Sequence, residues 1–169
     1  MSTDAVMKPS EKTNVVRTLE QRKIDFQAYS YESAGAITGL EVAAILGEDP
    51  AQVFKTLVTT GRSGQHYVFV IPVGAGLDLK KAARAVGEKS LEMLKQKDLL
   101  GLTGYIHGGC SPIGMKKAFR TTIDATAAQF DSIIFSGGRI GLQVQVGLKD
   151  LATVVRYELA DITTGLIHN

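Results

Sequence analysis

The chain has 169 residues, of which 44% are hydrophobic and 21% are charged, and its formal net charge is +2 at pH 7. These values predict one globular domain with a substantial core and no separate second domain. No apolar run is long enough to cross a bilayer, the charge is too small for a strongly basic nucleic-acid module, and the single cysteine excludes an internal disulfide. With no apolar signal run, a cytoplasmic protein is expected.

The N-terminal part of the chain predicts a leader, a helix and a strand. Residues 1–11 are expected to form a flexible leader. Val15, Val16 and Leu19 then recur at helical spacing among charged residues, which predicts an amphipathic first helix. The alternation over residues 26–31 is typical of a strand.

The next segment predicts a helix with both ends marked, followed by a hairpin. Thr38 and Glu41 have the spacing of a capping box ahead of an apolar stretch, and Gly47 stands where that helix would end. Two β-rich runs, 55–60 and 67–73, flank a Gly-Arg-Ser-Gly turn signal. We expect this hairpin to form the central pair of strands of a sheet.

A capped basic helix is predicted after the hairpin. Asp78 is a candidate N-cap for a helix through Val86, and Gly87 would close it. The helix carries a group of basic residues with two open interpretations, a phosphate-binding surface or an ordinary solvated face. This basic group consists of Lys80, Lys81 and Arg84.

The C-terminal third predicts two more strands and a helix. The runs 132–136 and 140–146 are strand-like across a Gly-Gly turn, and residues 149–155 are typical of a helix. No regular βαβ repeat is visible. The sequence therefore predicts a single mixed α/β domain over residues 12–160, with residues 161–169 as a C-terminal tail.

Lys55 interrupts an otherwise apolar, β-branched run. On a strand its side chain shares a face with Leu57, while Phe54 and Val58 point the other way, and both faces are expected to be largely buried. A buried ammonium group without a partner would be costly. Two interpretations remain open: Lys55 reaches into a pocket or meets an anion, or its stem packs at a strand end while its ammonium group stays in water.

Several familiar chemistries lack their required spacing. A Gly-Ala-Gly segment begins like a dinucleotide loop, but Leu79 occupies the third glycine position, so no nucleotide cofactor is expected. Ser111 is not in a nucleophile elbow and belongs to no visible triad. No metal site is predicted, because the chain has one cysteine and three scattered histidines, which are His66, His107 and His168.

The Gly108-Gly109 pair and the turn after it supply a backbone that can expose successive N–H groups. Such a loop can hold a carbonyl oxygen that gains negative charge, or it can be a plain Gly/Pro turn. Cys110 is interpreted as a small packed side chain rather than a nucleophile. His107 is interpreted as a helper or surface residue rather than a general base.

Four segments, in this order and at similar spacing, closely resemble the YbaK family of aminoacyl-tRNA deacylases, over roughly residues 12–160. Members of that family are similar to the editing domain inserted in bacterial prolyl-tRNA synthetases, and the YbaK branch clears cysteine mischarged onto proline tRNA. The resemblance implies a mixed, mostly antiparallel, barrel-like sheet with flanking helices. The matching segments are Val53-Phe54-Lys55-Thr56-Leu57, Leu77-Asp78-Leu79-Lys80-Lys81, Thr103-Gly104-Tyr105 with Gly108 to Gly114, and Ser136-Gly137-Gly138-Arg139 with Gly141-Leu142.

The resemblance also implies site residues. Lys55 would orient the terminal adenosine of the charged tRNA, and the backbone at Gly108 would receive the ester carbonyl. The basic group would face the tRNA acceptor end. Gln143 departs from the family pattern, because the cysteine-clearing branch usually carries aspartate there, and the stretch at Ile37 and Thr38 lacks an expected aromatic residue. Further substrate-binding residues would be Tyr31, Thr56, Gly109, Ser111 and Gln143.

The leading hypothesis is an aminoacyl-tRNA deacylase for Cys-tRNA(Pro) that acts beside prolyl-tRNA synthetase. In the mechanism that the resemblance implies, the thiol of the substrate attacks its own ester, and the enzyme supplies positioning and charge stabilisation without a cofactor or metal. Two alternatives are kept. One is a sister deacylase for Ala-, Ser- or Thr-tRNA that uses water, and the other is a non-catalytic adaptor that binds tRNA or the synthetase.

Overall fold

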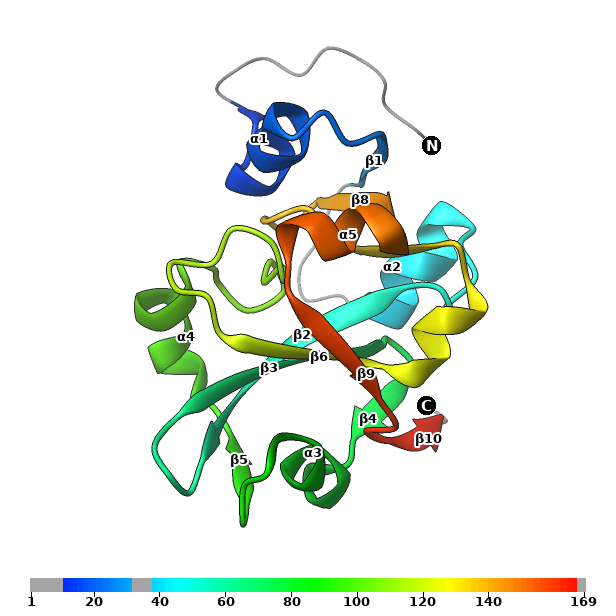
Figure 1. Cartoon of the computed structure of the whole chain (residues 1–169). Coiled ribbons are helices and arrows are strands. Elements are labelled where there is room, and N and C mark those ends of the chain that lie inside the picture. Colours follow the sequence, from blue (N-terminus) through cyan, green and yellow to red (C-terminus); the bar gives the residue numbers. More distant parts are fainter. Residues whose placement is uncertain (1–10, 32–37, 167–169) are drawn as a thin grey trace.

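The computed structural model describes residues 11–31 and 38–166. Figure 1 shows α1 at one end of the molecule and α3 at the other, with the strands between them. The elements in chain order are α1 (Asn14–Gln21), β1 (Phe26–Ser30), α2 (Gly39–Leu46), β2 (Phe54–Gly61), β3 (His66–Pro72), β4 (Ala75–Leu77), α3 (Leu79–Val86), β5 (Leu91–Met93), α4 (Gln96–Thr103), β6 (Arg120–Asp124), the 3-10 helix η2 (Ala125–Gln129), β7 (Ser132–Ser136), β8 (Leu142–Gly147), α5 (Leu148–Val154), β9 (Tyr157–Ala160) and β10 (Thr163–Leu166).

The helix ends follow the local signals in the sequence. The Thr38 hydroxyl accepts from the Glu41 N–H, and the Glu41 carboxylate accepts from the Thr38 N–H, so the predicted capping box is confirmed. The Asp78 carboxylate likewise caps α3. Gly47 and Gly87 close α2 and α3 in the left-handed conformation, with φ of 67° and 78°. The bounds of both helices are therefore set by residues next to them in sequence.

The strands form three sheets. The largest has the order β5-β2-β3-β6-β9, a second has the order β1-β8-β7, and β10 pairs with β4. The predicted hairpin is confirmed, because β2 pairs antiparallel with β3 from Lys55 opposite Ile71 to Thr60 opposite His66. Among the described strands, only the β3–β6 and β6–β9 pairs are parallel. The mixed, mostly antiparallel α/β architecture is thus as predicted.

The expected barrel-like closure is wrong. The largest sheet ends at β5 on one side and at β9 on the other, and these two edge strands do not pair with each other. Among the described residues, one isolated parallel bridge, between Val53 and Ile134, links this sheet to the second sheet. The Ile134 N–H donates to the Gln52 carbonyl there at 3.0 Å. The sheets are therefore open and packed against each other, with side chains rather than hydrogen bonds closing the space between them.

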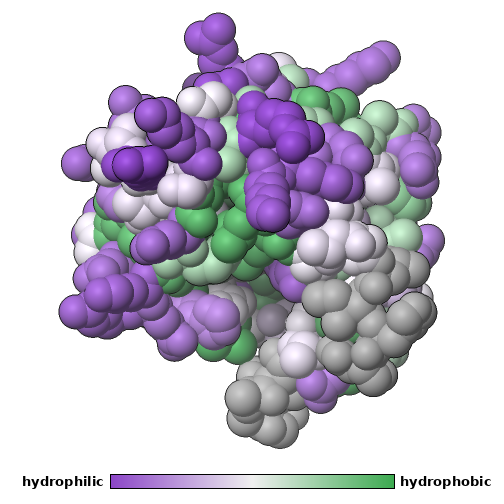
Figure 2. Space-filling view, turned by 90° about the horizontal axis from the view of Figure 1, so that it is seen from below, coloured by the Kyte–Doolittle hydropathy of each residue, from purple (hydrophilic) through white to green (hydrophobic). Residues whose placement is uncertain are grey.

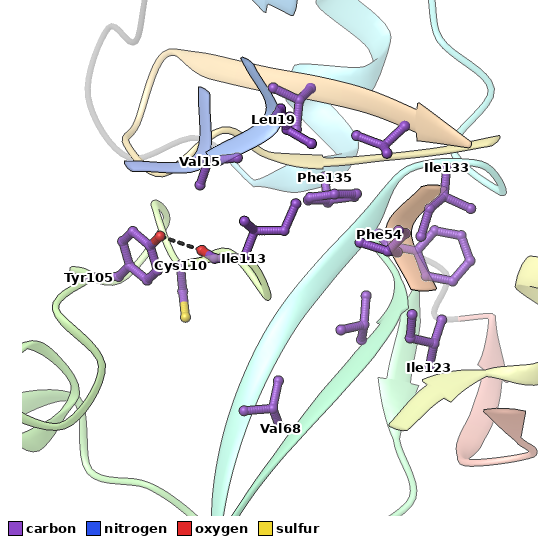
Figure 3. Packing of buried hydrophobic residues seen from close by; sticks show 14 of the residues in the cluster. Val15, Leu19, Phe54, Val68, Tyr105, Cys110, Ile113, Ile123, Ile133 and Phe135 are labelled. Carbon is purple, nitrogen blue, oxygen red and sulfur yellow. Dashed lines mark hydrogen bonds between the residues drawn. The ribbon is translucent and has the colours of Figure 1, made fainter. Parts of the chain in front are cut away.

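Two apolar clusters cover opposite faces of the largest sheet. Phe54 and Val58 belong to the main core, which Val15 and Leu19 of α1 also enter from above (Figure 3). On the other face, Leu57 packs against the cluster that fills the space between the sheet and α3. The alternation predicted for this strand is confirmed. Burial of each large apolar side chain contributes roughly 1.5–3 kcal/mol, so both faces of β2 are held firmly.

Residues 161–166, which were expected to belong to a C-terminal tail, are packed against the rest of the domain. Ile162 is fully buried, and its N–H donates to the Asp124 carboxylate at 3.1 Å. Residues 163–166 form β10, which pairs with β4. Residues 1–10 of the expected leader and residues 167–169 lie outside the described residues. Within the described part of the chain, every helix is too short or too polar to cross a membrane.

Candidate functional site

A cavity of about 360 Å³ lies where the two larger sheets meet the start of α2. The beginning of β2 forms one wall, and the ends of β1 and β7 approach from the second sheet. The segment that follows α4 closes another side. Predicted site residues that line this cavity are Tyr31, Lys55, Thr56, Gly108 and Gln143. Segments far apart in the sequence therefore converge at one place.

Lys55 places the ammonium-bearing side chain on this cavity. Its strand position is held by the neighbouring β3, where Ile71 is its partner. Lys55 is half-buried, and this burial lowers the pKa of its ammonium group because the charged form is poorly solvated. None of the ion pairs among the described residues involves Lys55. A half-buried cation without a protein anion favours the pocket interpretation over the solvated one.

Thr56 adds an unused hydroxyl next to the lysine. Its Oγ1 is buried, and no hydrogen-bond partner contacts it among the described residues. A buried hydroxyl without a partner costs about 1–3 kcal/mol, so such groups are rare unless a ligand satisfies them. Thr56 lines the same cavity as Lys55. Because neighbouring side chains on a strand point to opposite faces, a hydrogen bond from the Thr56 hydroxyl to the molecule that Lys55 binds stays a prediction.

The loop after α4 turns sharply at Gly108. The Gly109 N–H donates to the Ile106 carbonyl at 3.0 Å, and Gly108 has a φ of 86°, which is the requirement for the third residue of a type II turn. A side chain at Gly108 would begin 3.4 Å from the side chain of Ile140. Among the described residues, no acceptor contacts the Gly108 N–H. This N–H is free to donate to a ligand, whereas that of Gly109 is engaged in the turn.

Two predicted substrate contacts lie behind the loop instead of on the cavity. Ser111 is fully buried, and its hydroxyl accepts from the Ile113 N–H at 3.4 Å. Gly109 packs against the backbone of Arg139, which a Cβ atom would approach to 3.1 Å. Neither residue lines the cavity. Both shape the loop that carries Gly108, and their direct contact with substrate stays a prediction.

The cysteine of this loop is not an activated nucleophile. Burial raises the pKa of the Cys110 thiol to about 12, so the thiol keeps its proton at neutral pH. Near it, the Tyr105 hydroxyl donates to the Ile113 carbonyl, a bond that fixes the loop (Figure 3). His107 lines the cavity. The arrangement suits binding and charge stabilisation better than attack by a protein group.

Gln143 is buried on β8 and faces a carboxylate that the sequence analysis missed. β8 lies between β1 and β7, with Tyr29 and Ser136 opposite Gln143. With the Gln143 amide assigned so that its nitrogen faces Glu48, this nitrogen is 2.9 Å from both carboxylate oxygens. Glu48 belongs to no recognised motif and is 95 positions away in the chain. No sequence signal could have found this contact, because only the fold brings the two residues together.

The basic group on α3 is not part of this cavity. Lys80 and Arg84 are exposed and line a separate hollow of about 540 Å³ with apolar side chains such as Leu91. Figure 2 views this end of the molecule, where hydrophilic side chains surround an apolar area. Lys81 forms an ion pair, with Nζ 3.1 Å from the Asp161 carboxylate. A role of these three residues in tRNA binding stays a prediction.

Metal ligands do not cluster in the described part of the chain: no group of three or more His, Cys, Asp and Glu side chains is close enough to hold an ion. The departure expected at Ile37 lies outside the described residues. Lys55, Thr56, Gly108 and Gln143 line the cavity, and Glu48 contacts Gln143 without lining it. The roles of these residues in binding stay predictions.

Known proteins resemble this chain along most of its length. Residues 35–154 match the family described as "Aminoacyl-tRNA editing domain". The chain is 43% identical over 161 residues, or 95% of its length and 98% of the relative, to the Enterococcus faecalis protein named "Putative Cys-tRNA(Pro)/Cys-tRNA(Cys) deacylase EbsC".

Two solved structures have the same fold as this chain. One described as "a putative trans-editing enzyme for prolyl tRNA synthetase" has a TM-score of 0.78 and 26% identity, with 95% of this chain and 100% of that chain covered. A second, from work on epitope grafting onto scaffold proteins, has a TM-score of 0.81 and 28% identity at the same coverage. The resemblance indicated by the four sequence motifs is thereby confirmed, and the chain belongs to the aminoacyl-tRNA editing domain family.

Proposed function

We propose that this protein is an aminoacyl-tRNA deacylase that removes cysteine from tRNA(Pro). The observation that carries the proposal is the half-buried Lys55, which has no anion among the described residues and shares a cavity with the Thr56 hydroxyl and the Gly108 N–H. The terminal adenosine of a charged tRNA presents a phosphate, hydroxyl groups and an ester carbonyl. The three groups of the cavity match these in kind.

The roles of the three groups follow from their chemistry. A lysine and a phosphate about 4 Å apart attract each other by about 4 kcal/mol at the effective dielectric of a protein cleft, so Lys55 anchors the nucleotide. The Thr56 hydroxyl bonds to the ribose or to the aminoacyl group. The Gly108 N–H donates to the ester carbonyl oxygen and stabilises the negative charge that this oxygen gains in the transition state.

The nucleophile comes from the substrate. The sulfur of the cysteinyl group attacks the carbonyl carbon of its own ester, and a C–S bond forms. The bond between this carbon and the ribose oxygen breaks, and the thiol proton passes to the ribose oxygen. The products are a cysteine thiolactone and a tRNA with a free terminal hydroxyl. The protonated state of Cys110 is compatible with this route, in which the protein supplies position and charge stabilisation.

Prolyl-tRNA synthetase is the proposed partner, because the enzyme that mischarges tRNA(Pro) is the source of the substrate. The description of one solved relative as a trans-editing enzyme for this synthetase supports the proposal. A sister activity toward alanyl, seryl or threonyl esters is the second candidate. Gln143 favours it, since a neutral amide stands where the cysteine-clearing branch usually has aspartate.

The test compares hydrolysis of Cys-tRNA(Pro), Ala-tRNA(Pro) and Ser-tRNA by the wild type and by Lys55→Ala. Lys149→Ala, which removes an exposed lysine on α5, is the matched control. Release of cysteine by the wild type and the control, but not by Lys55→Ala, is expected. A cysteinyl ester with an S-methylated sulfur should not be cleaved. Release of alanine or serine instead would assign the sister activity, and tRNA binding without cleavage would assign an adaptor.

A further inference from the structure

The position of Glu48 is fixed by the end of α2. Gly47 ends this helix with a φ of 67°, and the Glu48 N–H donates to the Ala43 carbonyl at 2.9 Å. This arrangement is a Schellman-type helix end, which sets the direction in which the following residue leaves the helix. The Glu48 side chain contacts that of Gln143, which lines the cavity, whereas Glu48 itself is not a lining residue.

Gln143 holds this carboxylate from the cavity wall. Its side chain is only 6% exposed, and its strand lies between two neighbours in the second sheet. The amide is assigned with its nitrogen toward Glu48, because the opposite orientation would set the amide oxygen against both carboxylate oxygens. In the assigned orientation the nitrogen lies 2.9 Å from each oxygen. Since Gln143 lines the cavity, Glu48 stands one side chain from its interior.

Among the described residues, the Glu48 carboxylate forms no ion pair. The amide of Gln143, which contacts it, is neutral. Burial raises the pKa of the Glu48 carboxyl to about 7, because it removes water from around the charged form. Nearby, burial and the charge of Glu48 both raise the pKa of Tyr29. A carboxylate has about four acceptor positions, so capacity remains for a cationic donor.

We propose that Glu48, positioned by Gln143, binds the α-ammonium group of the aminoacyl ester. The inference rests on the proposed deacylase function, since it assigns one end of that substrate. The 3′ end of a charged tRNA carries a phosphate on one side of the ribose and an ammonium group on the other. The cavity region matches this with a cation, Lys55, and a separate anion, Glu48. Glu48 thereby supplies the charge that Gln143 lacks, and Gln143 acts as the positioning residue.

Binding measurements test the subsite without requiring turnover. The probes are adenosine joined to cysteine through a 3′-amide, which cannot be hydrolysed as an ester, and the same compound with an N-acetylated amino group. By titration calorimetry, the wild type should bind the free amine about tenfold to a hundredfold more tightly, which is the range for a hydrogen bond to a charged group. Glu48→Gln should lose this preference while its affinity for the acetylated compound stays unchanged.

Two further variants separate recognition from structure. Glu88→Gln is the matched control, because Glu88 follows a helix-ending glycine in the same way but lies at α3, and it should keep the preference. The double variant Glu48→Gln/Gln143→Asp restores a carboxylate at the cavity wall and should regain the preference. A wild type that does not prefer the free amine would overturn the inference, as would equal losses for both probes in Glu48→Gln.

The same proteins then show which proposal fails. The wild type and Glu48→Gln are assayed on Cys-tRNA(Pro). If the wild type shows the amine preference but cleaves no ester, the proposed function fails and the subsite stands. If the wild type cleaves the ester and Glu48→Gln binds and cleaves with unchanged constants, the deacylase stands and the subsite is rejected.

Discussion

Two helix ends in this protein have the same local structure and opposite surroundings. Gly47-Glu48 ends α2 and Gly87-Glu88 ends α3, and in both cases the glutamate N–H donates at 2.9 Å to a carbonyl of the preceding helix. Glu88 accepts hydrogen bonds from Ser63 and from the Tyr67 hydroxyl, and these bonds lower the pKa of its carboxyl. The Glu48 carboxylate accepts only from the neutral amide of Gln143 among the described residues, and burial raises the pKa of the Glu48 carboxyl.

The difference extends to the regions around the two helix ends. Near α3 the charges are paired or solvated. Lys81 forms an ion pair with Asp161, and Lys80 and Arg84 are exposed to solvent. At the cavity, Lys55 and Glu48 are both half-buried and without an ion pair among the described residues. A buried charge without a partner of opposite charge lowers the stability of a protein. The presence of such charges is explained when a ligand supplies the opposite charge. The cavity region is therefore where substitutions should change function.

The largest effect is expected from Lys55→Met, which keeps the apolar stem and removes the charge. Deacylation of Cys-tRNA(Pro) should fall at least about thirtyfold in kcat/KM, because loss of one partner of a desolvated charge pair costs roughly 2–5 kcal/mol. The melting temperature should stay the same or rise, since an unpaired half-buried charge is removed.

Lys149→Met, on α5, is the control for this prediction. It should change kcat/KM by less than about threefold, because Lys149 is exposed and does not line the cavity. Similar losses in the two variants would mean that general positive charge, rather than the position of Lys55, supports the activity.

The second effect contrasts two glycines with positive φ. Gly108→Ala and Gly87→Ala each place a side chain in the left-handed region and should each lower the unfolding free energy by about 1–2 kcal/mol. A Cβ at Gly87 meets nothing within 4 Å, whereas one at Gly108 lies 3.4 Å from Ile140. Only Gly108→Ala should also lower kcat, about tenfold, because the loop that presents its N–H must shift. Denaturant unfolding and single-turnover cleavage measure the two quantities separately.

Local sequence signals predicted the parts of the fold that depend on neighbouring residues. The capping box at Thr38, the N-cap at Asp78 and the glycine helix ends are of this kind. The sequence analysis missed α4, whose N-cap Lys95 makes no side-chain hydrogen bond, and it missed β6, whose buried threonines read as polar. In β6, pairing with β3 and β9 overrides weak local preference.

The site was predictable to the extent that its residues share a short segment. Lys55 and Thr56 were found together because they are adjacent on one strand. The Glu48–Gln143 contact depends on the register of β8 and on the packing of α2, which no motif encodes. The exposed basic group was predicted from charge alone, and its partner Asp161 lies in the segment that was expected to be a tail.

The third prediction concerns pH and compares the two glutamates. The pKa of Glu48 in the folded protein, about 7, lies above its ordinary value of 4.5, so its contribution to stability is present below pH 4.5 and is lost as the pH rises through 7. Relative to the wild type, Glu48→Gln should gain about 1 kcal/mol of unfolding free energy between pH 5 and pH 8, after allowance for solvent screening.

The lowered pKa of Glu88 has the opposite sign. Its contribution is present above pH 4.5 and is lost as the pH falls through its lowered value, so Glu88→Gln should be less stable than the wild type at pH 7 and approach it in acid. Urea unfolding across this pH range measures both differences. Parallel curves for the two variants would contradict the assignment of opposite environments.

The smallest effect is expected from the ion pair that ties α3 to the C-terminal segment. Lys81 Nζ lies 3.1 Å from the Asp161 carboxylate and 3.0 Å from the Thr163 carbonyl, but the Asp161 side chain is 72% exposed. Exposed pairs contribute about 0.2–1 kcal/mol, so a double-mutant cycle with Lys81→Met and Asp161→Asn should give a coupling energy at the low end of this range. The coupling should fall in high salt, because exposed charges are screened. A coupling above about 2 kcal/mol would place a strongly stabilising charge pair at α3, and the contrast between satisfied surface charges there and unsatisfied charges at the cavity would then need a different explanation.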